Sequence, residues 1–559
     1  MFSSRSKSTD EVIVDKEPPP VVAVGKVDMD KTSQPDTVSH KNRLKIVDGS
    51  HGSNVINLSP EPLMFSSAEN LFSLLVETKP KSPPLTNYIN GEKAEQKFSS
   101  DPDFHFSKSY LSSLLEVKGT TLQELKTQHQ EFVEKIHHLN MSIFGDKHKT
   151  IDGEGIVMVG GGRFSWLSLL NINQLRSTGC KLPVEVFIAS EQEYEPDFCE
   201  DLLPSLNAKC ILGYKELPIV KYQNRLEIDG YQYKILAIFT SSFKNVLLLD
   251  ADNVVVRDPR HLFEWPDFLS TGLVVWPDCW SRTTHPYYYD IAGITVGDRP
   301  VRGQFMESES PEDWNFHDLP GTLPNPSSES GMLLVNKEKH VDTMLLSMYY
   351  NMFGPSHYYP LLTQGGAGEG DKDTFIAAAY ALQKPIYQVK QSMKFLGYHD
   401  DYGYHAKALG QWDPTTNTEK HMPPYMSNYY VAPEDDDSQL MFMHLSYPKL
   451  YPDKLREEIS WEQNGELHHR KLYPGDLPNH DYGFDLRMWE LITQLICPSW
   501  RPNSDENPAS VEIPDKLRGL DMHYIQTSQS SKECEDLFLP HLEYLRTHTA
   551  TDDGVYRYE

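Results

Sequence analysis

The chain has 559 residues, of which 52 are basic and 80 acidic, for a formal net charge of −28 at pH 7. A surface of this sign repels the phosphate backbone of nucleic acids, so nucleic acid is not expected as a partner. A nucleotide sugar is not excluded, because one divalent cation can offset a diphosphate locally. The length exceeds the roughly 250–300 residues at which a single core stops growing, which predicts more than one folded region.

The first 100 residues offer little apolar material for a core. Residues 1–62 are rich in Ser, Asp, Lys and Pro, a composition that predicts a disordered tail or stalk. Residues 67–77 are the exception, because their apolar side chains predict a short helix that docks on the main domain. Residues 79–100 are again typical of a linker. We therefore assign 1–100 to a disordered tail and stem.

A second helix is predicted over residues 121–140, where apolar residues recur at helical spacing. Thr121 is expected to cap this helix, with Glu124 three residues later as its partner in a capping box. Because the helix leads into the next domain, residues 101–150 are assigned as a helical region between stem and domain.

Strands and helices alternate from Gly155 onward. This alternation predicts a doubly wound α/β domain with right-handed crossovers, which we assign to residues 151–455. Residues 456–559 are mostly helical in pattern and are expected to form an extension packed on that domain. The elements expected in the first half of the α/β domain are strands at 156–159, 183–188, 210–212 and 246–249 and helices at 164–177 and 231–242.

Six cysteines are present, and none forms a C-x-x-C pair, so a zinc site is not expected. Cys180, Cys199 and Cys210 lie close enough in sequence to supply a disulfide in an oxidising lumen. Buried free thiols explain these three residues equally well.

The strongest single feature is the apolar strand at 246–249 followed by Asp250 and Asp252. Ligands of open α/β sheets bind beyond the carboxyl ends of the strands. Two carboxylates at such a position can share a Mn²⁺ or Mg²⁺ ion and place it against a diphosphate.

The same residues fit a second class of enzyme. Residues 250–254 also match the D-x-D-x-[TV] signature of haloacid-dehalogenase-type phosphatases, in which the first Asp, here Asp250, is a nucleophile. Those enzymes carry the motif on the first strand of their core. Here a long strand–helix stretch precedes it within the domain, as a nucleotide-binding half would, and this position favours a transferase.

Two small-residue turns supply further polar groups. Gly160, Gly161 and Gly162 follow the first strand, where glycines let the backbone approach a ligand, and Arg163 could then meet phosphate or base. A plain tight turn explains these residues equally well. Glu329 precedes the apolar run at 332–335 and is a candidate contact for donor or acceptor hydroxyls.

An acid-rich loop and a histidine complete the candidates. Residues 365–375 combine glycines with acids that include Asp371 and Asp373, and we expect them to form a mobile edge of the active site. Helix capping is the competing explanation for the two aspartates. His444 ends a strand-like run, where a neutral imidazole can complete a manganese shell, and Lys449 five residues later can neutralise a leaving diphosphate.

Several ordered blocks together resemble the fungal Golgi alpha-mannosyltransferases that build cell-wall mannan. They look closer to the alpha-1,2 branch-initiating group than to the alpha-1,3 terminal-capping group. The blocks are residues 155–162, 230–252, 275–278, 291–294, 370–375 and 444–450.

The resemblance implies an α/β fold of the GT-A type with a doubly wound mixed sheet, GDP-mannose as donor, Mn²⁺ as cofactor and a mannose-containing N-linked glycan as acceptor. It also implies retention of configuration, because donor and product are both alpha-linked. Alpha-1,3 specificity remains the alternative within the family. A phosphatase using Asp250, or an inactive scaffold or glycan-binding relative, are the alternatives of another class.

The residues predicted for the site are Asp250, Asp252 and His444 for the metal, Asp371 and Asp373 for catalysis, and Gly161, Gly162, Arg163, Lys234, Asp278, Glu329 and Lys449 for substrate binding. By the resemblance, Asp371 and Asp373 would face donor and acceptor, and Lys449 would assist departure of the diphosphate. Retaining enzymes of this fold lack an agreed nucleophile. Asp371 is therefore assigned only as a polar catalytic residue, and a mechanism in which the leaving phosphate takes the acceptor proton fits equally well.

The resemblance implies the Golgi lumen as the location, with association to the Golgi membrane or to a mannosyltransferase complex. The family resembles type II membrane proteins with one membrane helix and a stem. In this sequence no run approaches the roughly 20 apolar residues needed to cross a bilayer, and the N-terminus has no apolar signal core. Residues 1–150 are expected to supply the stem alone.

Overall fold

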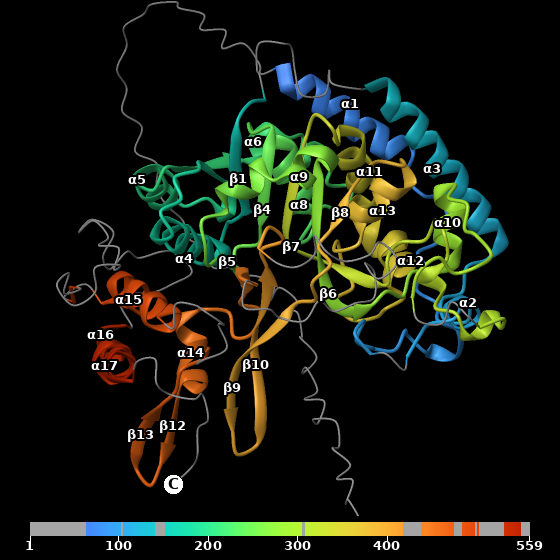
Figure 1. The fold of residues 1–559 in the computed structure, drawn as a ribbon. Helices are drawn as coiled ribbons and strands as arrows, with labels where there is room; N and C mark the ends of the chain where they lie inside the picture. Colours follow the sequence, from blue (N-terminus) through green and yellow to red (C-terminus); the bar gives the residue numbers. More distant parts are fainter. Residues whose placement is uncertain are drawn as a thin grey trace, which may run out of the picture. The chain divides into compact units, whose positions relative to one another are not determined.

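A computed structural model of the chain describes residues 63–101, 104–139, 151–303, 308–416, 438–473, 483–497, 500–501 and 530–548. In this part of the chain the strands form a seven-stranded sheet of order β3-β2-β1-β4-β7-β6-β8, a four-stranded sheet of order β5-β11-β10-β9 and a pair, β12-β13 (Figure 1). The strands are β1 Glu154–Val159, β2 Val184–Ile188, β3 Ala208–Leu212, β4 Asn245–Leu249, β5 Asn253–Val255, β6 Leu273–Ser281, β7 Pro326–Asn336, β8 Tyr387–Gln388, β9 Lys394–Asp400, β10 Gly403–Trp412, β11 Leu440–His444, β12 Ser460–Gln463 and β13 Glu466–His469.

Helices surround the strands. They are α1 Leu63–Glu77, α2 Lys108–Ser112, α3 Gly119–Leu139, α4 Arg163–Ser177, α5 Leu203–Ser205, α6 Gly213–Glu216, α7 Ile219–Tyr222, α8 Gln232–Thr240, α9 Pro266–Thr271, α10 Pro286–Ala292, α11 Val341–Met352, α12 Tyr359–Thr363, α13 Thr374–Ala381, α14 Pro452–Ile459, α15 Phe484–Ile496, α16 Ser530–Glu533 and α17 Leu539–Thr547. Among the described residues, no helix is both long and apolar enough to span a bilayer.

The seven-stranded sheet is mixed, and β4 stands where its direction changes. Strands β3, β2, β1 and β4 run parallel to one another, whereas β7 is antiparallel to both β4 and β6. The apolar run of β4 is therefore buried between a parallel and an antiparallel neighbour rather than between two parallel ones. The predicted α/β class with a mixed sheet is confirmed.

Alternate residues of the central strands face two different cores. Ile156 of β1 and Leu247 of β4 belong to the core that α4 covers. Val157 and Leu248 belong to the other core, with Ile235 of α8. Because a strand sends successive side chains to opposite faces, β1 and β4 must be apolar throughout when helices cover both faces.

The N-terminal helices pack on the second core. Phe72 of α1 is fully buried and its ring lies 5.5 Å from that of Tyr222. The predicted capping box of α3 is wrong, because the helix begins at Gly119 and Thr121 lies inside its first turn. The Glu124 carboxylate instead accepts hydrogen bonds from the backbone N–H groups of Lys81 and Ser82, at 2.7 and 3.2 Å.

The segment predicted as a linker, 79–100, packs against the α/β domain. The backbone N–H of Leu85 donates to the carbonyl of Ser356 at 2.7 Å, and the rings of Phe98 and Trp280 stack at 4.9 Å. These contacts make the segment part of the folded body. The domain limits at residues 100, 150 and 455 stay a prediction.

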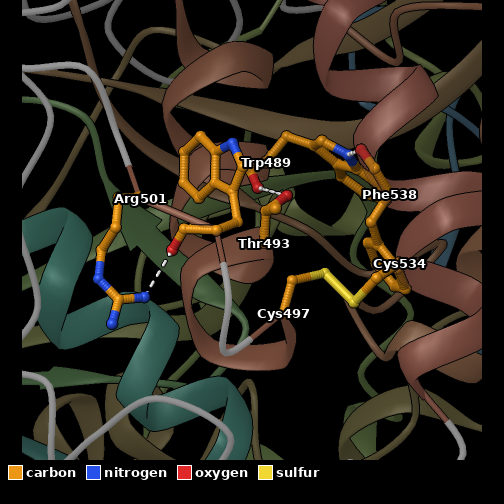
Figure 2. The surroundings of a disulfide bond; sticks show 7 residues. Trp489, Thr493, Cys497, Arg501, Cys534 and Phe538 are labelled. Atoms are coloured by element: carbon orange, nitrogen blue, oxygen red, sulfur yellow. Dashed lines mark hydrogen bonds between the residues drawn. A yellow bond between two sulfur atoms is a disulfide. The ribbon is translucent and has the colours of Figure 1, made fainter.

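The C-terminal helices share the core that lies under α4. A disulfide between Cys497 and Cys534 joins the end of α15 to the segment before α17. Figure 2 shows the packing beside it, where the Trp489 indole N–H donates to the carbonyl of Phe538 at 3.1 Å and the two rings stack at 5.3 Å. The two apolar stretches expected in this region lie in α15 and α17. The assignment of residues 456–559 to an extension packed on the α/β domain stays a prediction.

A second disulfide joins Cys199 to Cys210 in β3. Of the three neighbouring cysteines considered above, these two pair, and Cys180 is a buried free thiol. The predicted disulfide and the predicted buried free thiol therefore both occur within this group of three cysteines.

The two disulfides differ in the loop that each closes. Their sequence separations are 37 residues for Cys497–Cys534 and 11 residues for Cys199–Cys210. Because loop-closure entropy grows with the logarithm of loop length, Cys534→Ser should lower the free energy of unfolding by about 1 kcal/mol more than Cys199→Ser. Urea unfolding of both variants without reductant, followed by tryptophan fluorescence, measures the difference. Equal losses would contradict the loop-length argument.

Candidate active site

Three predicted metal ligands meet beyond the carboxyl end of β4. Asp250 and Asp252 follow that strand directly, and His444 ends β11. Strand β5 begins at Asn253 and pairs antiparallel with β11, so that Asn253 lies opposite His444. This pairing brings two parts of the chain far apart in sequence together, and one ligand atom from each of the three side chains lies within 4.8 Å of the others.

Charged neighbours surround these ligands. His444 Nε2 lies 3.4 Å from Asp252 Oδ1, its Nδ1 lies 3.5 Å from Glu329 Oε1, and the Lys449 ammonium pairs with Asp252. Burial opposes ionisation of Asp252, but His444 and Lys449 hold the pKa of that carboxyl well below its usual range. Burial likewise opposes ionisation of Glu329, yet His444 leaves its pKa at about 2.

Lys234 of α8 bridges the metal ligands and the acid-rich loop. Its Nζ lies 2.8 Å from Asp250 Oδ2 and 3.5 Å from Asp371 Oδ2, and it donates to the Ser330 carbonyl and hydroxyl at 3.2 Å. The Ser330 hydroxyl donates to Asp371 Oδ1 at 3.0 Å. Burial raises the pKa of Asp371 to about 6, against the opposing effect of Lys234. Lys234 thus contacts the predicted metal site directly, and Asp371 is linked to it through Lys234.

The donor set fits a divalent cation. Two carboxylates and an imidazole suit manganese, and an ion at this point would leave positions for phosphate oxygens. Burial disfavours charge on His444, but Asp252 and Glu329 still raise its pKa well above the usual range. The surroundings therefore stabilise positive charge where the three ligand atoms converge.

Two other predicted site residues lie in buried ion pairs. The Asp373 carboxylate pairs with Nη1 of the fully buried Arg282 at 2.7 Å and accepts the backbone N–H of Ser328 at 2.9 Å. Asp278 pairs with Lys372 Nζ at 2.8 Å. These contacts join the acid-rich loop to β6 and β7. The catalytic role of Asp373 and the substrate role of Asp278 stay predictions that this pairing does not support.

The turn after β1 has a backbone conformation that requires glycine at two positions. Gly161 and Gly162 have φ angles of 94° and 54°, a region that L side chains rarely adopt. Arg163 turns to the C-terminal part of the chain, where it pairs with Asp453 at 2.8 Å and covers the Tyr451 ring at 4.2 Å. The turn follows β1, which pairs in parallel with β4, the strand that Asp250 follows. Arg163 itself contacts Asp453 and Tyr451.

The acid-rich loop is held by its own residues. The Glu369 carboxylate accepts the Thr363 hydroxyl at 2.7 Å and the Gly365 N–H at 2.8 Å. Lys372 donates to the Ala367 carbonyl at 2.9 Å. Closure of this loop over a donor stays a prediction.

Sequence reasoning assigned no role to several residues of the site. Tyr231 lies with its ring 5.7 Å from Lys234 Nζ, and a Cβ at Gly370 would come 2.9 Å from that ring. Asn171 of α4 donates to the backbone carbonyls of Asp250 and Asn253, at 3.3 and 2.8 Å. A tyrosine at the start of α8 and an asparagine inside α4 carry no local signal for such contacts.

The sequence is similar to those of known proteins that belong to one family. Residues 153–413 match the family model described as "Mannosyltransferase putative". The alpha-1,2-mannosyltransferase MNN2 of Candida albicans is 39% identical over 83% of this chain and 81% of its own length, and MNN2 of Saccharomyces cerevisiae is 35% identical over 78% and 79%. A crystal structure of the galactosyltransferase LgtC aligns over 43% of this chain and 73% of its own, at 13% identity and a TM-score of 0.26, too weak a likeness to argue from. The predicted family and enzyme class are confirmed. The chain belongs to the family of fungal alpha-1,2-mannosyltransferases.

Proposed function

We propose that this protein transfers mannose from GDP-mannose in alpha-1,2 linkage to a mannose-containing glycan of the mannan type, with Mn²⁺ bound and with the alpha configuration retained. The observation that carries the proposal is the convergence of Asp250, Asp252 and His444 within 4.8 Å at the carboxyl edge of the sheet. The names of the relatives support the sugar and the linkage, and leave alpha-1,3 transfer as the weaker alternative. Family membership decides against a phosphatase that would use Asp250.

In this proposal Asp250, Asp252 and His444 hold the metal, which neutralises the diphosphate of the donor. Lys449 pairs with Asp252 and is 39% exposed, so its ammonium can also reach a phosphate oxygen. The bond between the anomeric carbon and phosphate breaks as the acceptor oxygen bonds to that carbon. The hydroxyl proton of the acceptor passes to the departing phosphate.

Asp371 acts through Lys234 rather than on the sugar. Its side chain is 3% exposed and faces Lys234 and Ser330, so it has no direct access to a reacting carbon. The buried Lys234 stays charged, because Asp250 and Asp371 outweigh the effect of burial and keep its pKa above the usual range. Asp371 is therefore a positioning residue, and Glu329, beside His444, is the next candidate to face the substrate.

The two disulfides support a location in an oxidising compartment, since such bonds are rare in the cytosol. We assign the protein to the Golgi lumen, where association with the Golgi membrane or with other mannosyltransferases would be expected from the family.

Removing one charge from the metal site tests its role. Asp252→Asn should weaken Mn²⁺ binding about tenfold or more and lower mannose transfer at least about a hundredfold, because the cation loses the negative charge of one ligand and the diphosphate is then held less well. Mn²⁺ titration and a panel of sugar nucleotides with a mannose oligosaccharide measure the two effects. Asp267→Asn, an exposed carboxylate of the same domain, is the control. Near-normal turnover by folded Asp252→Asn at low Mn²⁺ would remove the metal role.

Substitution of Asp371 is expected to affect turnover, whereas substitution of Asp373, two positions later, is expected to affect stability. Asp371→Ala should lower turnover at least about a hundredfold with little change in GDP affinity, because Lys234 loses one of its two anchors. Asp373→Asn should instead lower the free energy of unfolding by about 3–5 kcal/mol, since Arg282 is left unpaired in the core. Single-turnover rates and urea unfolding separate the effects. Full activity of Asp371→Ala would show that Asp371 does not position Lys234 for the reaction.

A further inference from the structure

The carboxyl ends of three neighbouring parallel strands form one edge of the sheet. Residues 190–193 follow β2, the glycine turn at 160–162 follows β1, and Asp250 follows β4. Because adjacent strands lie about 4.8 Å apart, the ends of β2 and β4 are separated by about 10 Å. A diphosphate held at Asp250 would therefore allow the attached nucleoside to extend over the glycine turn toward the end of β2.

The glycine turn has a carboxylate on one side. A Cβ added at Gly161 would come 3.1 Å from Glu193 Cβ and 3.2 Å from Glu193 Oε2, so the absent side chain leaves room for Glu193. The Gly162 N–H donates to the Glu193 carbonyl at 3.4 Å, which ties the two segments together. Phe164, whose N–H donates to the Gly161 carbonyl at 3.1 Å, has a side chain that is 47% exposed. A half-buried acid and an exposed ring thus flank one turn.

The Glu193 carboxylate can accept further hydrogen bonds. The Ser190 hydroxyl donates to its Oε2 at 3.0 Å, and no ion pair among the described residues includes Glu193. A carboxylate has about four acceptor sites, so Ser190 satisfies only part of them. Burial raises the pKa of Glu193, and the nearby Asp229 raises it further, which means that donors from a ligand would be favourable here.

We propose that Glu193 selects guanine as the base of the donor nucleotide, by accepting hydrogen bonds from its N1–H and its N2 amino group while the Phe164 ring covers one face of the base. The inference rests on the proposed function, because it concerns the same donor. Guanine presents two adjacent donors on this edge, which a carboxylate accepts together. Uracil presents one N–H between two carbonyls, which a carboxylate repels, so the same group excludes UDP-sugars. Every base can stack on an aromatic ring, so Phe164 would add affinity without selectivity.

Glu193→Gln tests the assignment through a change of preference rather than a loss. The Gln carbonyl still accepts the N1–H, while its amide now donates to the C2 carbonyl of xanthine and opposes the N2 amino group of guanine. The ratio of the affinity for xanthosine diphosphate to that for GDP, measured by calorimetry with Mn²⁺ and the full chain, should rise about 100-fold over that of the unmodified protein. Glu191→Gln, an exposed residue two positions earlier, should leave the ratio unchanged. A ratio for Glu193→Gln within about threefold of the unmodified protein overturns the assignment.

A second measurement needs no variant. Inosine diphosphate lacks the N2 amino group, so the unmodified protein should bind it about tenfold or more weakly than GDP. Equal affinities overturn the role of Glu193. Phe164→Ala should weaken binding of GDP, inosine diphosphate and xanthosine diphosphate alike, and unchanged affinities would remove the ring from the proposal. If the unmodified protein binds UDP and not GDP, the proposed donor itself is wrong, whereas GDP binding with an unchanged preference in Glu193→Gln refutes only this inference.

Discussion

The site depends on the compensation of negative charge buried at the end of β4. Asp250 and Asp252 stand where the strand leaves the core, and an unpaired buried carboxylate costs several kcal/mol. Lys234 meets Asp250 from α8, while His444 and Lys449 meet Asp252 from the segment that begins with β11. Lys234, His444 and Lys449 therefore offset the charge of the two carboxylates. A divalent cation coordinated by His444 would require the neutral imidazole, so it would take the place of the proton on that ring.

The four-stranded sheet brings the cationic side chains of the β11 segment to Asp252. Its order, β5-β11-β10-β9, begins with the short strand that follows the predicted ligands Asp250 and Asp252 and places β11 directly beside that strand. His444 then lies opposite Asn253. The backbone N–H of Asn253 donates to the Asp250 carbonyl at 3.0 Å and closes the turn that contains Asp252. The C-terminal extension packs on the core shared with β1 and α4, and Arg163 at the start of α4 contacts Asp453 and Tyr451 across that interface. The catalytic edge and the extension are thus parts of one packed body.

A second layer of buried charge lies behind the acid-rich loop. The pairs Asp373–Arg282 and Asp278–Lys372 connect the loop to β6 and to the start of β7. Of Asp371 and Asp373, only Asp371 pairs with Lys234. The loop can therefore present one carboxylate to the metal site while the other anchors it, a division of roles that follows from which cation each carboxylate meets.

The sequence by itself was sufficient for what depends on neighbouring residues. Apolar runs predicted β1, β2, β4 and β11 to within a few residues, because a strand covered on both faces must be apolar along its length. The two aspartates after β4 also predicted a candidate metal site at the carboxyl end of that strand, where the structure brings His444 beside them. The tertiary structure alone decided which distant partner each polar group meets. Glu124 has the spacing of a capping box but accepts hydrogen bonds from the backbone N–H groups of Lys81 and Ser82. Asp373 was predicted as a catalytic acid but forms an ion pair with Arg282. Hydrogen bonds and ion pairs depend on distances in space. The fold brings Glu124 to Lys81, 43 positions away, and Asp373 to Arg282, 91 positions away, and no local sequence pattern records either contact.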